Sequence, residues 1–290
     1  MDIMLFIFIS CWVTYLLFIW IFDKLRFKDV SSSKTILITG AAQGLGKELA
    51  FIYASKGCKV IIWDICDHLF PCLEQEINEK GYQVYLFKCD ITSIEQIKHA
   101  LQLTLSQVPK IDILINNAGF SSNYLFEDLP FDRIHKTINI NVLGHLMVTK
   151  ELSQLCEQIV VVASIMSKCP AEKAADYSAS KHAIDACFRS YRLELKRKKS
   201  SKKLMIVYPI HIKTALFEGY HAKNVEFVKS LEPFDAAFSI YKAACLGKEE
   251  LFLPFYSWVF PYIIEWFPST IRDRVYLFLT EGALDRVKSR

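Results

Sequence analysis

Short apolar runs alternate with amphipathic stretches from residue 35 to residue 208, and this alternation constrains the fold more than any other feature of the chain. The apolar runs are rich in Val, Ile and Leu, which is typical of parallel strands that are buried on both faces. The pattern predicts an α/β fold with a doubly wound parallel sheet and helices on both faces. The expected strands are residues 35–39, 59–64, 83–88, 111–116, 159–163 and 204–208, and the expected helices are residues 44–56, 69–80, 93–107, 131–155 and 174–198.

The composition excludes several classes of protein. The chain has 290 residues and a net charge of only +4 with scattered basic residues, so we expect no nucleic-acid partner. Its nine cysteines form no Cys-x-x-Cys pair and no Cys/His ligand spacing, which indicates reduced thiols in the cytosol and no metal site. The length after the first apolar stretch suits one α/β domain better than two.

Ile3–Phe22 is a run of twenty residues without a formal charge. A helix of that length spans a hydrocarbon core of about 30 Å. A cleaved signal peptide would have a basic start, a shorter apolar core and a small-residue cleavage site, and a buried soluble helix would have a polar face. We therefore predict an N-terminal transmembrane helix. Lys24, Arg26 and Lys28 follow it, and the positive-inside rule then places the rest of the chain in the cytosol.

Two later segments allow more than one interpretation. The basic stretch Lys196–Lys203 is either a solvated loop or a contact to anionic lipid headgroups. Leu251–Trp266 is very apolar, but Pro254 and Pro261 interrupt it, so it is not expected to span a membrane as one helix. This second segment would line an apolar pocket, pack against another subunit or lie in the membrane interface.

A glycine-rich turn, Thr39–Gly46, joins the first expected strand to the first expected helix. Gly40 permits the tight turn, Gly44 lets the backbone approach a pyrophosphate, and Gly46 allows close packing of the helix on the strand. The phosphates would lie at the helix N-terminus, at Gly44, Leu45 and Gly46, where free N–H groups favour anions. Because the turn stands between a strand and a helix, we predict a dinucleotide site.

Polar residues end the next strands. Asp64 would accept hydrogen bonds from the adenosine ribose and repel a 2′-phosphate, which favours NAD over NADP; alternatively it is a strand-end turn residue. Asp90 would bind the adenine amino group or cap the following helix. Asn116 and Asn117 would hold neighbouring strands together through their side-chain amides, and Gly119 would leave room for the cofactor.

Tyr177 and Lys181 are four residues apart in an expected helix, so their side chains share one face. An ammonium group beside a phenol favours the phenolate, and we expect it to lower the pKa of Tyr177 toward working pH. Such a tyrosine can exchange a proton with an alcohol or a carbonyl. The spacing alone is also compatible with a solvated helix face, and its meaning depends on the motifs that stand upstream.

These motifs together resemble the short-chain dehydrogenase/reductase superfamily over about residues 34–255. The resemblance implies a Rossmann-like fold and a nicotinamide cofactor. Further features resemble the membrane-bound branch that holds epidermal-type retinol dehydrogenases and lipid-droplet 17β-hydroxysteroid dehydrogenases. These features are the expected anchor, Trp63-Asp64-Ile65, Asn141-Val142-Leu143-Gly144-His145 and the apolar C-terminus.

The resemblance implies a role for each matching residue. Tyr177 would be the catalytic acid and base, and Lys181 would bind the nicotinamide ribose and depress the tyrosine pKa. Ser164 would hydrogen-bond the substrate oxygen. Asn141 would hold a water molecule in the proton relay.

Two further residues match positions that contact the cofactor in the family. Asn117 would be a cofactor-side contact, and Thr214 would grip the nicotinamide amide. The chain also departs from the family pattern. Ile210 and Ser167 stand where the family usually has glycine, and the stretch 150–159 is several residues short, so the helix before it is expected to end early.

We therefore predict a membrane-anchored NAD-dependent oxidoreductase that interconverts a lipophilic alcohol, retinol-like, steroid-like or long-chain, and its carbonyl. The expected location is the endoplasmic reticulum membrane or a lipid droplet, facing the cytosol, and a homodimer is possible by analogy with the family. The alternatives are an NADPH-dependent lipid carbonyl reductase and a non-catalytic membrane scaffold that retains the fold. The expected parts are an anchor with its basic flank (1–29), a catalytic domain (30–255) and an apolar C-terminal extension (256–290).

Overall fold

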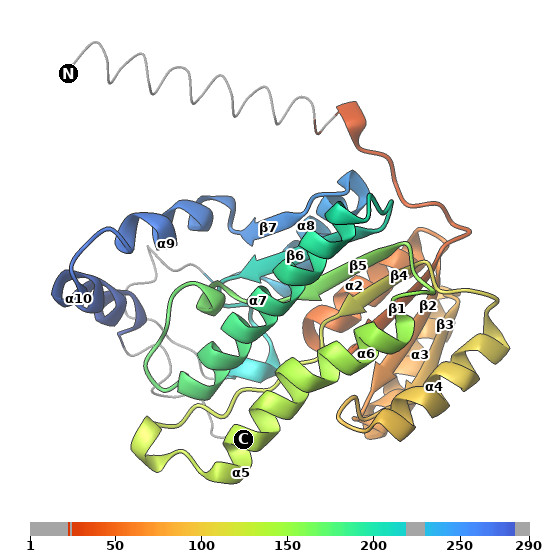
Figure 1. Cartoon of the computed structure of the whole chain (residues 1–290). Helices are drawn as coiled ribbons and strands as arrows, with labels where there is room; N and C mark the ends of the chain where they lie inside the picture. The colour runs from red at the N-terminus through yellow and green to blue at the C-terminus, as the bar shows by residue number, and fades with distance from the viewer. Residues whose placement is uncertain (1–22, 24, 219–229, 282–290) are drawn as a thin grey trace.

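The computed structural model describes residue 23, residues 25–218 and residues 230–281 (Figure 1). The predicted transmembrane helix at residues 3–22 lies outside the described residues. Within the described ranges, no helix combines the length and the apolar character that a bilayer crossing requires.

Seven strands form one parallel sheet in the order β3-β2-β1-β4-β5-β6-β7. The chain builds outward from β1 to β3, returns to the centre, and adds the other strands on the opposite side. This is the predicted doubly wound sheet, so the Rossmann-like α/β fold is confirmed. The strands are β1 (Thr35–Thr39), β2 (Lys59–Asp64), β3 (Val84–Lys88), β4 (Ile113–Asn116), β5 (Gln158–Val162), β6 (Lys203–Pro209) and β7 (Glu250–Leu253).

Helices cover both faces of the sheet (Figure 1). One face carries α2 (Gly44–Ser55), α3 (Phe70–Lys80) and α8 (Pro233–Leu246). The other face carries α4 (Ile94–Gln107), α6 (His145–Leu152) and α7 (Ala175–Arg197). The remaining helices are α5 (Phe131–Ile138), α9 (Val259–Ile264), α10 (Ser269–Thr280), the π-helical η3 (Asn139–Gly144) and the short 3₁₀ helices η1 (Asp67–Leu69), η2 (Phe126–Asp128), η4 (Ile165–Ser167), η5 (Ala215–Phe217) and η6 (Phe255–Trp258).

The core follows from the alternation of side chains along each strand. In β1, Ile36 and Ile38 pack with Leu49 of α2 on one face, while Leu37 packs with Ile184 of α7 on the other. All five side chains are fully buried. Burial of each such side chain contributes roughly 1.5–3 kcal/mol, so the strands need apolar residues at every position. This requirement explains why the strands were recognisable in the sequence.

The expected elements agree with the structure to within about two residues, with one larger difference. The helix predicted over 131–155 consists of α5, η3 and α6 and ends at Leu152, which confirms the expected early end. The elements after residue 230 had not been predicted, except that the prolines argued against one spanning helix. In the structure Pro254 precedes η6, and Pro261 lies within the first turn of α9.

The strand order reverses between β1 and β4, and the carboxyl ends of these strands border a crevice. The glycine turn follows β1, Asn117 follows β4, and Ser164 lies just beyond β5. Parallel strands place their carboxyl ends at one edge of the sheet. The fold therefore brings the separated motifs of the sequence together.

Candidate active site

Ser164, Tyr177 and Lys181 lie together at the carboxyl end of β5. Ser164 precedes η4, and the other two residues stand one turn apart on α7. The phenol of Tyr177 is hydrogen-bonded to the side chain of Ser164. The Lys181 Nζ lies 5.6 Å from the centroid of the Tyr177 ring. All three residues line one cavity, so the predicted group is assembled in space.

Burial sets the acidity of this pair. It raises the pKa of the Tyr177 phenol, and the hydrogen bond from Ser164 lowers that pKa by a smaller amount. Burial also lowers the pKa of Lys181 to about 8, and its Nζ donates to the Val162 carbonyl at 2.9 Å. The expected depression of the Tyr177 pKa is therefore not found in the protein alone, because the sequence argument took the ammonium into account but not the loss of solvation.

Asn141 lies in η3, the π-helical segment between α5 and α6. Its Oδ1 accepts from the Phe120 N–H at 2.8 Å, and its Nδ2 donates to the Phe120 carbonyl at 2.8 Å and to Ser180 Oγ at 2.9 Å. The amide is fully buried and both of its N–H groups are used. A water molecule held by Asn141, as expected, would therefore bind one of its oxygens, the main-chain carbonyl or the second lone pair of Oδ1. A π-helical turn is frequent at functional sites.

Close backbone approaches explain two of the glycines in the turn after β1. Gly40 has a φ of +65°, and a Cβ there would lie 2.6 Å from the Cα of Ala118. A Cβ on Gly46 would lie 2.4 Å from the Gly40 carbonyl oxygen and 2.6 Å from Asn117 Nδ2. The expected role of Gly46 in packing thus involves the turn itself and the end of β4. Gly44 and Leu45 line the cavity at the start of α2.

Asp64 is buried at the end of β2. Its Oδ2 accepts from the Ala42 N–H at 2.8 Å, and its Oδ1 accepts from the Cys66 N–H at 2.9 Å. The carboxylate therefore stabilises the glycine turn, which is the structural alternative considered for it. Each oxygen retains a second lone pair, and Asp64 lines the cavity. A ribose contact remains compatible with these bonds.

Asp90 also lines the cavity, but it does not cap α4. Its Oδ1 accepts from the Thr92 N–H at 2.8 Å and from the Thr92 hydroxyl at 2.7 Å. The helix cap is Ser93, whose Oγ accepts from the Gln96 N–H at 3.2 Å. The capping alternative for Asp90 is therefore wrong, because Ser93 satisfies the first turn of the helix.

The asparagines after β4 hold neighbouring segments together, as expected. Asn117 Nδ2 donates to the carbonyls of Thr39 and Gly40 at 3.0 and 2.8 Å, and Asn116 Nδ2 donates to Thr149 Oγ1 at 2.7 Å. Asn117 also lines the cavity. It can therefore combine a structural role with the predicted cofactor contact.

The loop after β6 carries Ile210 and Thr214, which both line the cavity. Thr214 precedes η5, and its methyl group would lie 3.2 Å from a Cβ on Gly44. Ile210 donates its N–H to the Leu253 carbonyl at 2.8 Å and has no left-handed φ. The departure from glycine at Ile210 therefore causes no backbone strain.

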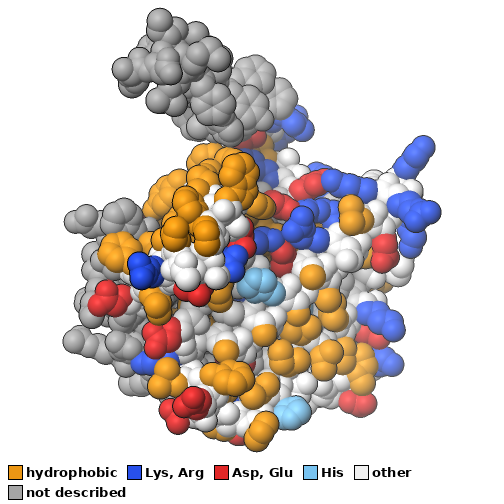
Figure 2. All heavy atoms as spheres, turned by 60° about the vertical axis from the view of Figure 1, so that its left-hand side comes forward, with side chains coloured by type: hydrophobic (Ala, Val, Ile, Leu, Met, Phe, Trp, Pro, Cys, Tyr) orange, Lys and Arg blue, Asp and Glu red, His pale blue; other side chains and the backbone are white. Residues whose placement is uncertain are grey.

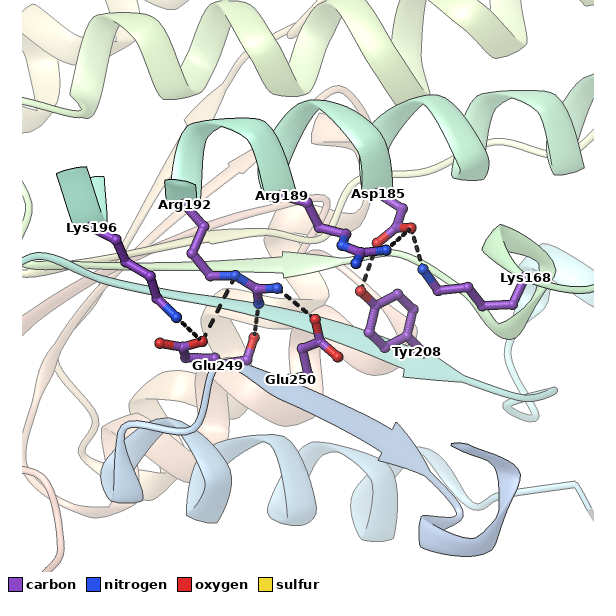
Figure 3. Close-up of polar contacts among 8 residues, drawn as sticks. All are labelled: Lys168, Asp185, Arg189, Arg192, Lys196, Tyr208, Glu249 and Glu250. Carbon is purple, nitrogen blue, oxygen red and sulfur yellow. Dashed lines mark hydrogen bonds and ion pairs between the residues drawn. The ribbon is translucent and has the colours of Figure 1, made fainter. Parts of the chain in front are cut away.

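The segment after Ser164 is tied to α7 and β6 by a group of charged and polar side chains (Figure 3). Lys168 forms a buried ion pair with Asp185 of α7, and the Tyr208 hydroxyl donates to the other oxygen of that carboxylate at 2.6 Å. Arg189 lies 3.8 Å from the same carboxylate. Among the residues that the structure describes, the Ser167 hydroxyl has no hydrogen-bond partner, so Ser167 adds no tie where the family usually has glycine.

The cavity has a volume of about 690 Å³ and extends from Asp64 and Asp90 to Tyr177 and the C-terminal helices. Its C-terminal part is mostly apolar, and Leu251–Trp266 therefore lines a pocket, which was one of the three interpretations. Sequence reasoning missed the contribution of α10, which lies beyond the part that resembles the family. The lining residues contributed by α9 and α10 are Val259, Phe260, Ile263, Ile264, Tyr276, Leu279 and Thr280.

The residues present fit a nicotinamide dinucleotide. The glycine turn can approach a pyrophosphate at the N-terminus of α2, Asp64 offers acceptors, and Lys181 offers a donor at the other end of the same cavity. Among the described residues that line it, Lys181 is the only lysine or arginine.

Comparisons with known proteins agree with this geometry. A family model described as short chain dehydrogenase matches residues 34–224. Short-chain dehydrogenase/reductase family 16C member 6 of Bos taurus is 31% identical over 240 residues, which cover 80% of this chain and 75% of that protein. Epidermal retinol dehydrogenase 2 of Mus musculus is 30% identical over 230 residues, which cover 77% of this chain and 74% of that protein.

Solved structures share the fold. A short-chain dehydrogenase/reductase of Burkholderia phymatum in complex with NAD has a TM-score of 0.68 at 19% identity and covers 78% of this chain and 89% of that chain. An alcohol dehydrogenase of Thermococcus sibiricus complexed with 5-hydroxy-NADP has a TM-score of 0.68 at 21% identity and covers 76% of this chain and 95% of that chain. With the family match and the relatives at 30% identity or above, the chain belongs to the short-chain dehydrogenase/reductase family and is an NAD(P)-dependent oxidoreductase that acts on CH–OH groups.

Proposed function

We propose that the protein is a membrane-anchored, NAD-dependent oxidoreductase of a lipophilic alcohol and its carbonyl. The observation that carries the proposal is the single cavity in which Ser164, Tyr177 and Lys181 face an apolar lining from α9 and α10. Retinol-like, steroid-like and long-chain alcohols have the required chemistry. The relative named epidermal retinol dehydrogenase supports this choice of substrate class.

The side chains of the site would accept the hydroxyl proton of the alcohol and pass it to solvent. When bound, the nicotinamide cofactor supplies hydride transfer. Tyr177 would take the hydroxyl proton of the alcohol, and Ser164, already hydrogen-bonded to that phenol, would steady the substrate oxygen. Lys181 would hold the ribose and favour the phenolate. The route to solvent would pass Lys181 and a water molecule on one of the oxygens of Asn141.

The choice of NAD over NADP rests on charge. Asp64 is a buried carboxylate at the ribose end of the expected site, and Ile65 and Cys66 beside it are uncharged. A 2′-phosphate would meet a carboxylate and no cation from the described lining. We therefore propose NAD, and an NADPH-dependent reductase is the alternative outcome of a cofactor-preference assay.

The test compares the detergent-solubilised full-length protein with Tyr177→Phe on a panel of lipophilic alcohols. Loss of the hydroxyl should lower turnover by at least ~10², the scale of general acid–base catalysis, with little change in cofactor affinity. Formation of NADH is the measurement. Tyr82→Phe is a matched control, because Tyr82 is half-buried, packs against Phe51 and lies outside the cavity lining. Turnover by Tyr177→Phe equal to that of the control would contradict the mechanism and favour a scaffold.

A further inference from the structure

We infer that η6, α9 and α10 form a second membrane contact beside the mouth of the active-site cavity. The contact surface consists of Phe255, Tyr262, Ile263, Trp266, Phe267 and Leu277, and we call it the C-terminal apolar surface. It would rest in the interface of a lipid bilayer. The membrane contact is independent of the proposed function. Direct entry of substrate from the bilayer, however, rests on the proposal that the substrate is lipophilic.

The first observation is the exposure of these side chains. Trp266 is 91% exposed, Phe255 61% and Tyr262 51%, and all three lie within a stretch of twelve residues. Figure 2 turns the side with α9 and α10 toward the viewer and shows hydrophobic side chains gathered near the top of the described surface. A contiguous patch of this kind marks a surface that another phase or partner covers.

The second observation is that the same helices have an inner, apolar face. Phe260 and Ile264 of α9 and Leu279 of α10 line the cavity, while Tyr262 and Trp266 point to solvent. Ile263 is 54% exposed and also lines the cavity, so the cavity lining and the exposed surface meet at this residue. If lipid covers that surface, the cavity opens beside an apolar phase and not into water.

The third observation concerns the chain that leads into this part of the protein. Asp23 forms an ion pair with Lys248 at 2.5 Å, just before β7, and β7 leads directly into η6 and α9. Twenty-two residues precede Asp23, and they include the uncharged run of twenty that is long enough to cross a bilayer. The end of that run is thus fastened at the amino end of β7, the edge strand whose carboxyl end leads into the C-terminal apolar surface.

These features favour lipid over a second copy of the chain. Trp and Tyr are enriched where a protein meets the membrane interface. On α10, Arg272 pairs with Glu265 at 2.7 Å, and Asp273 and Arg274 balance each other, so the described part of the surface has no net cationic character. The contact should therefore form with neutral phosphatidylcholine and should not depend on salt.

The test uses the full-length protein in phosphatidylcholine vesicles that contain a phospholipid with a photoactivatable diazirine in its acyl chain. After irradiation, mass spectrometry should find lipid adducts on the peptide that spans residues 255–277. The internal control is the segment from η2 to the start of α5 with Phe126 and Phe131, which are 75% and 83% exposed but far from α9 in sequence and outside the cavity lining. Equal labelling of both peptides, or none on 255–277, would overturn the inference.

A paired variant links the contact to substrate entry. Tyr262→Glu with Trp266→Glu should reduce adduct formation on 255–277 about tenfold, because two anionic side chains disfavour insertion. The same variant should raise KM for an alcohol supplied in vesicles and leave kcat in detergent micelles unchanged, and Phe131→Glu should change neither. Adduct formation does not require turnover, so it decides the membrane contact even if no alcohol is oxidised. A change from dimer to monomer in detergent, without any lipid adducts in the wild type, would assign the surface to a second copy and refute the inference.

Discussion

At the scale of single residues, burial determines the protonation of the groups around the catalytic pair. Lys181 has a pKa of about 8 because its ammonium is removed from water. Below that pH the charged form predominates and can support a Tyr177 phenolate. The phenol, whose pKa is raised by burial, needs this positive charge close by during proton transfer. Lys181 Nζ lies 5.6 Å from the centroid of the Tyr177 ring, but burial still dominates the pKa of the phenol.

His145 shows the same effect in a side chain that the mechanism does not use. Its Nε2 lies 2.7 Å from the Ala118 carbonyl, so Nε2 must carry the proton in the neutral ring. Its Nδ1 is buried and has no hydrogen-bond partner among the described residues. Burial, together with the nearby charge of Lys181, lowers the pKa of His145 to about 3.

This pKa predicts a pH dependence of stability. Between pH 6.5 and about pH 3 the unfolded protein binds a proton at His145 that the folded protein excludes, so stability falls as the pH falls through this range. The contribution of a shift of that size is on the order of 5 kcal/mol. Urea unfolding of the detergent-solubilised protein at several pH values measures it, and His145→Gln should lose this part of the slope. A variant with the same slope as the wild type would show that His145 is accessible to protons.

Asp64 is the residue on which the proposed choice of NAD over NADP depends. Replacing it by Ala removes a ribose acceptor and a charge that repels phosphate, and Ile65→Arg adds a cation for a 2′-phosphate. The double variant should therefore shift the ratio of kcat/KM for NAD and NADP by more than ~10-fold toward NADP. Ile65→Arg alone is the control, because it leaves Asp64 and its bonds to the turn in place. A wild-type protein that already prefers NADPH would show that Asp64 does not exclude the phosphate.

At the scale of elements, the strands and most helices could be predicted because each strand is buried on both faces and is therefore continuously apolar. The π-helical η3 could not be predicted, since its sequence continues the helical pattern of α5 without a break. The helices α9 and α10 escaped prediction because their apolar residues face two ways, toward the cavity and toward solvent. Periodicity identifies one buried face and gives no clear signal for two.

The sequence predicted the positions of the site residues better than their pKa values and hydrogen bonds. Ser164, Tyr177 and Lys181 line one cavity at the edge that the carboxyl ends of the parallel strands share, whereas Asn141 does not line it and is buried, with a hydrogen bond to Ser180 of α7. The predicted direction of the Tyr177 pKa shift was wrong, because the solvation of the phenol depends on tertiary packing. The second roles of Asp64 and Asn117, in bonding the glycine turn, also depend on contacts between distant segments.

The ion pair between Lys168, in the segment after Ser164, and Asp185 of α7 gives a prediction at this scale. Lys168→Met would leave the buried Asp185 carboxylate without its close cation and should lower stability by about 3 kcal/mol. The double variant Lys168→Met with Asp185→Asn should be less destabilised than the single variant, because it leaves no buried charge unpaired and the amide oxygen can still accept from the Tyr208 hydroxyl. Chemical unfolding of the three proteins measures both values. Equal stability of wild type and Lys168→Met would mean that Arg189 alone satisfies the carboxylate.

At the scale of the whole molecule, the described N-terminal residues are part of the folded body. Phe27 packs edge-on against Tyr241 of α8, and Asp29 accepts from the Tyr241 hydroxyl at 2.8 Å and pairs with Lys56 at 3.1 Å. A membrane anchor that ends at residue 22 would therefore connect to the domain without a long flexible linker. The domain would be held close to the bilayer, which is the arrangement that a lipophilic substrate requires.

The topology of the chain is tested with the full-length protein in microsomes. It should stay in the pellet after carbonate extraction, because residues 3–22 are long enough to cross a bilayer. Protease added outside intact vesicles should digest the catalytic domain, because Lys24, Arg26 and Lys28 favour a cytosolic flank. A protected domain would reverse the topology, and release by carbonate would mean that residues 3–22 are not a transmembrane anchor.

A truncated chain separates the anchor from the rest of the protein. Removal of residues 1–22 keeps Asp23, Phe27 and Asp29, and with them the contacts to Lys248 and Tyr241, so the domain should fold and bind NAD. Carbonate should release this chain, because the truncation removes residues 3–22, the run that is predicted to span the bilayer. At neutral pH, however, part of it should still float with phosphatidylcholine vesicles, since the C-terminal apolar surface remains. Flotation should persist in high salt, because an apolar contact is not screened, and loss of flotation in salt would mean that charges, and not Trp266 and its neighbours, hold the protein to lipid.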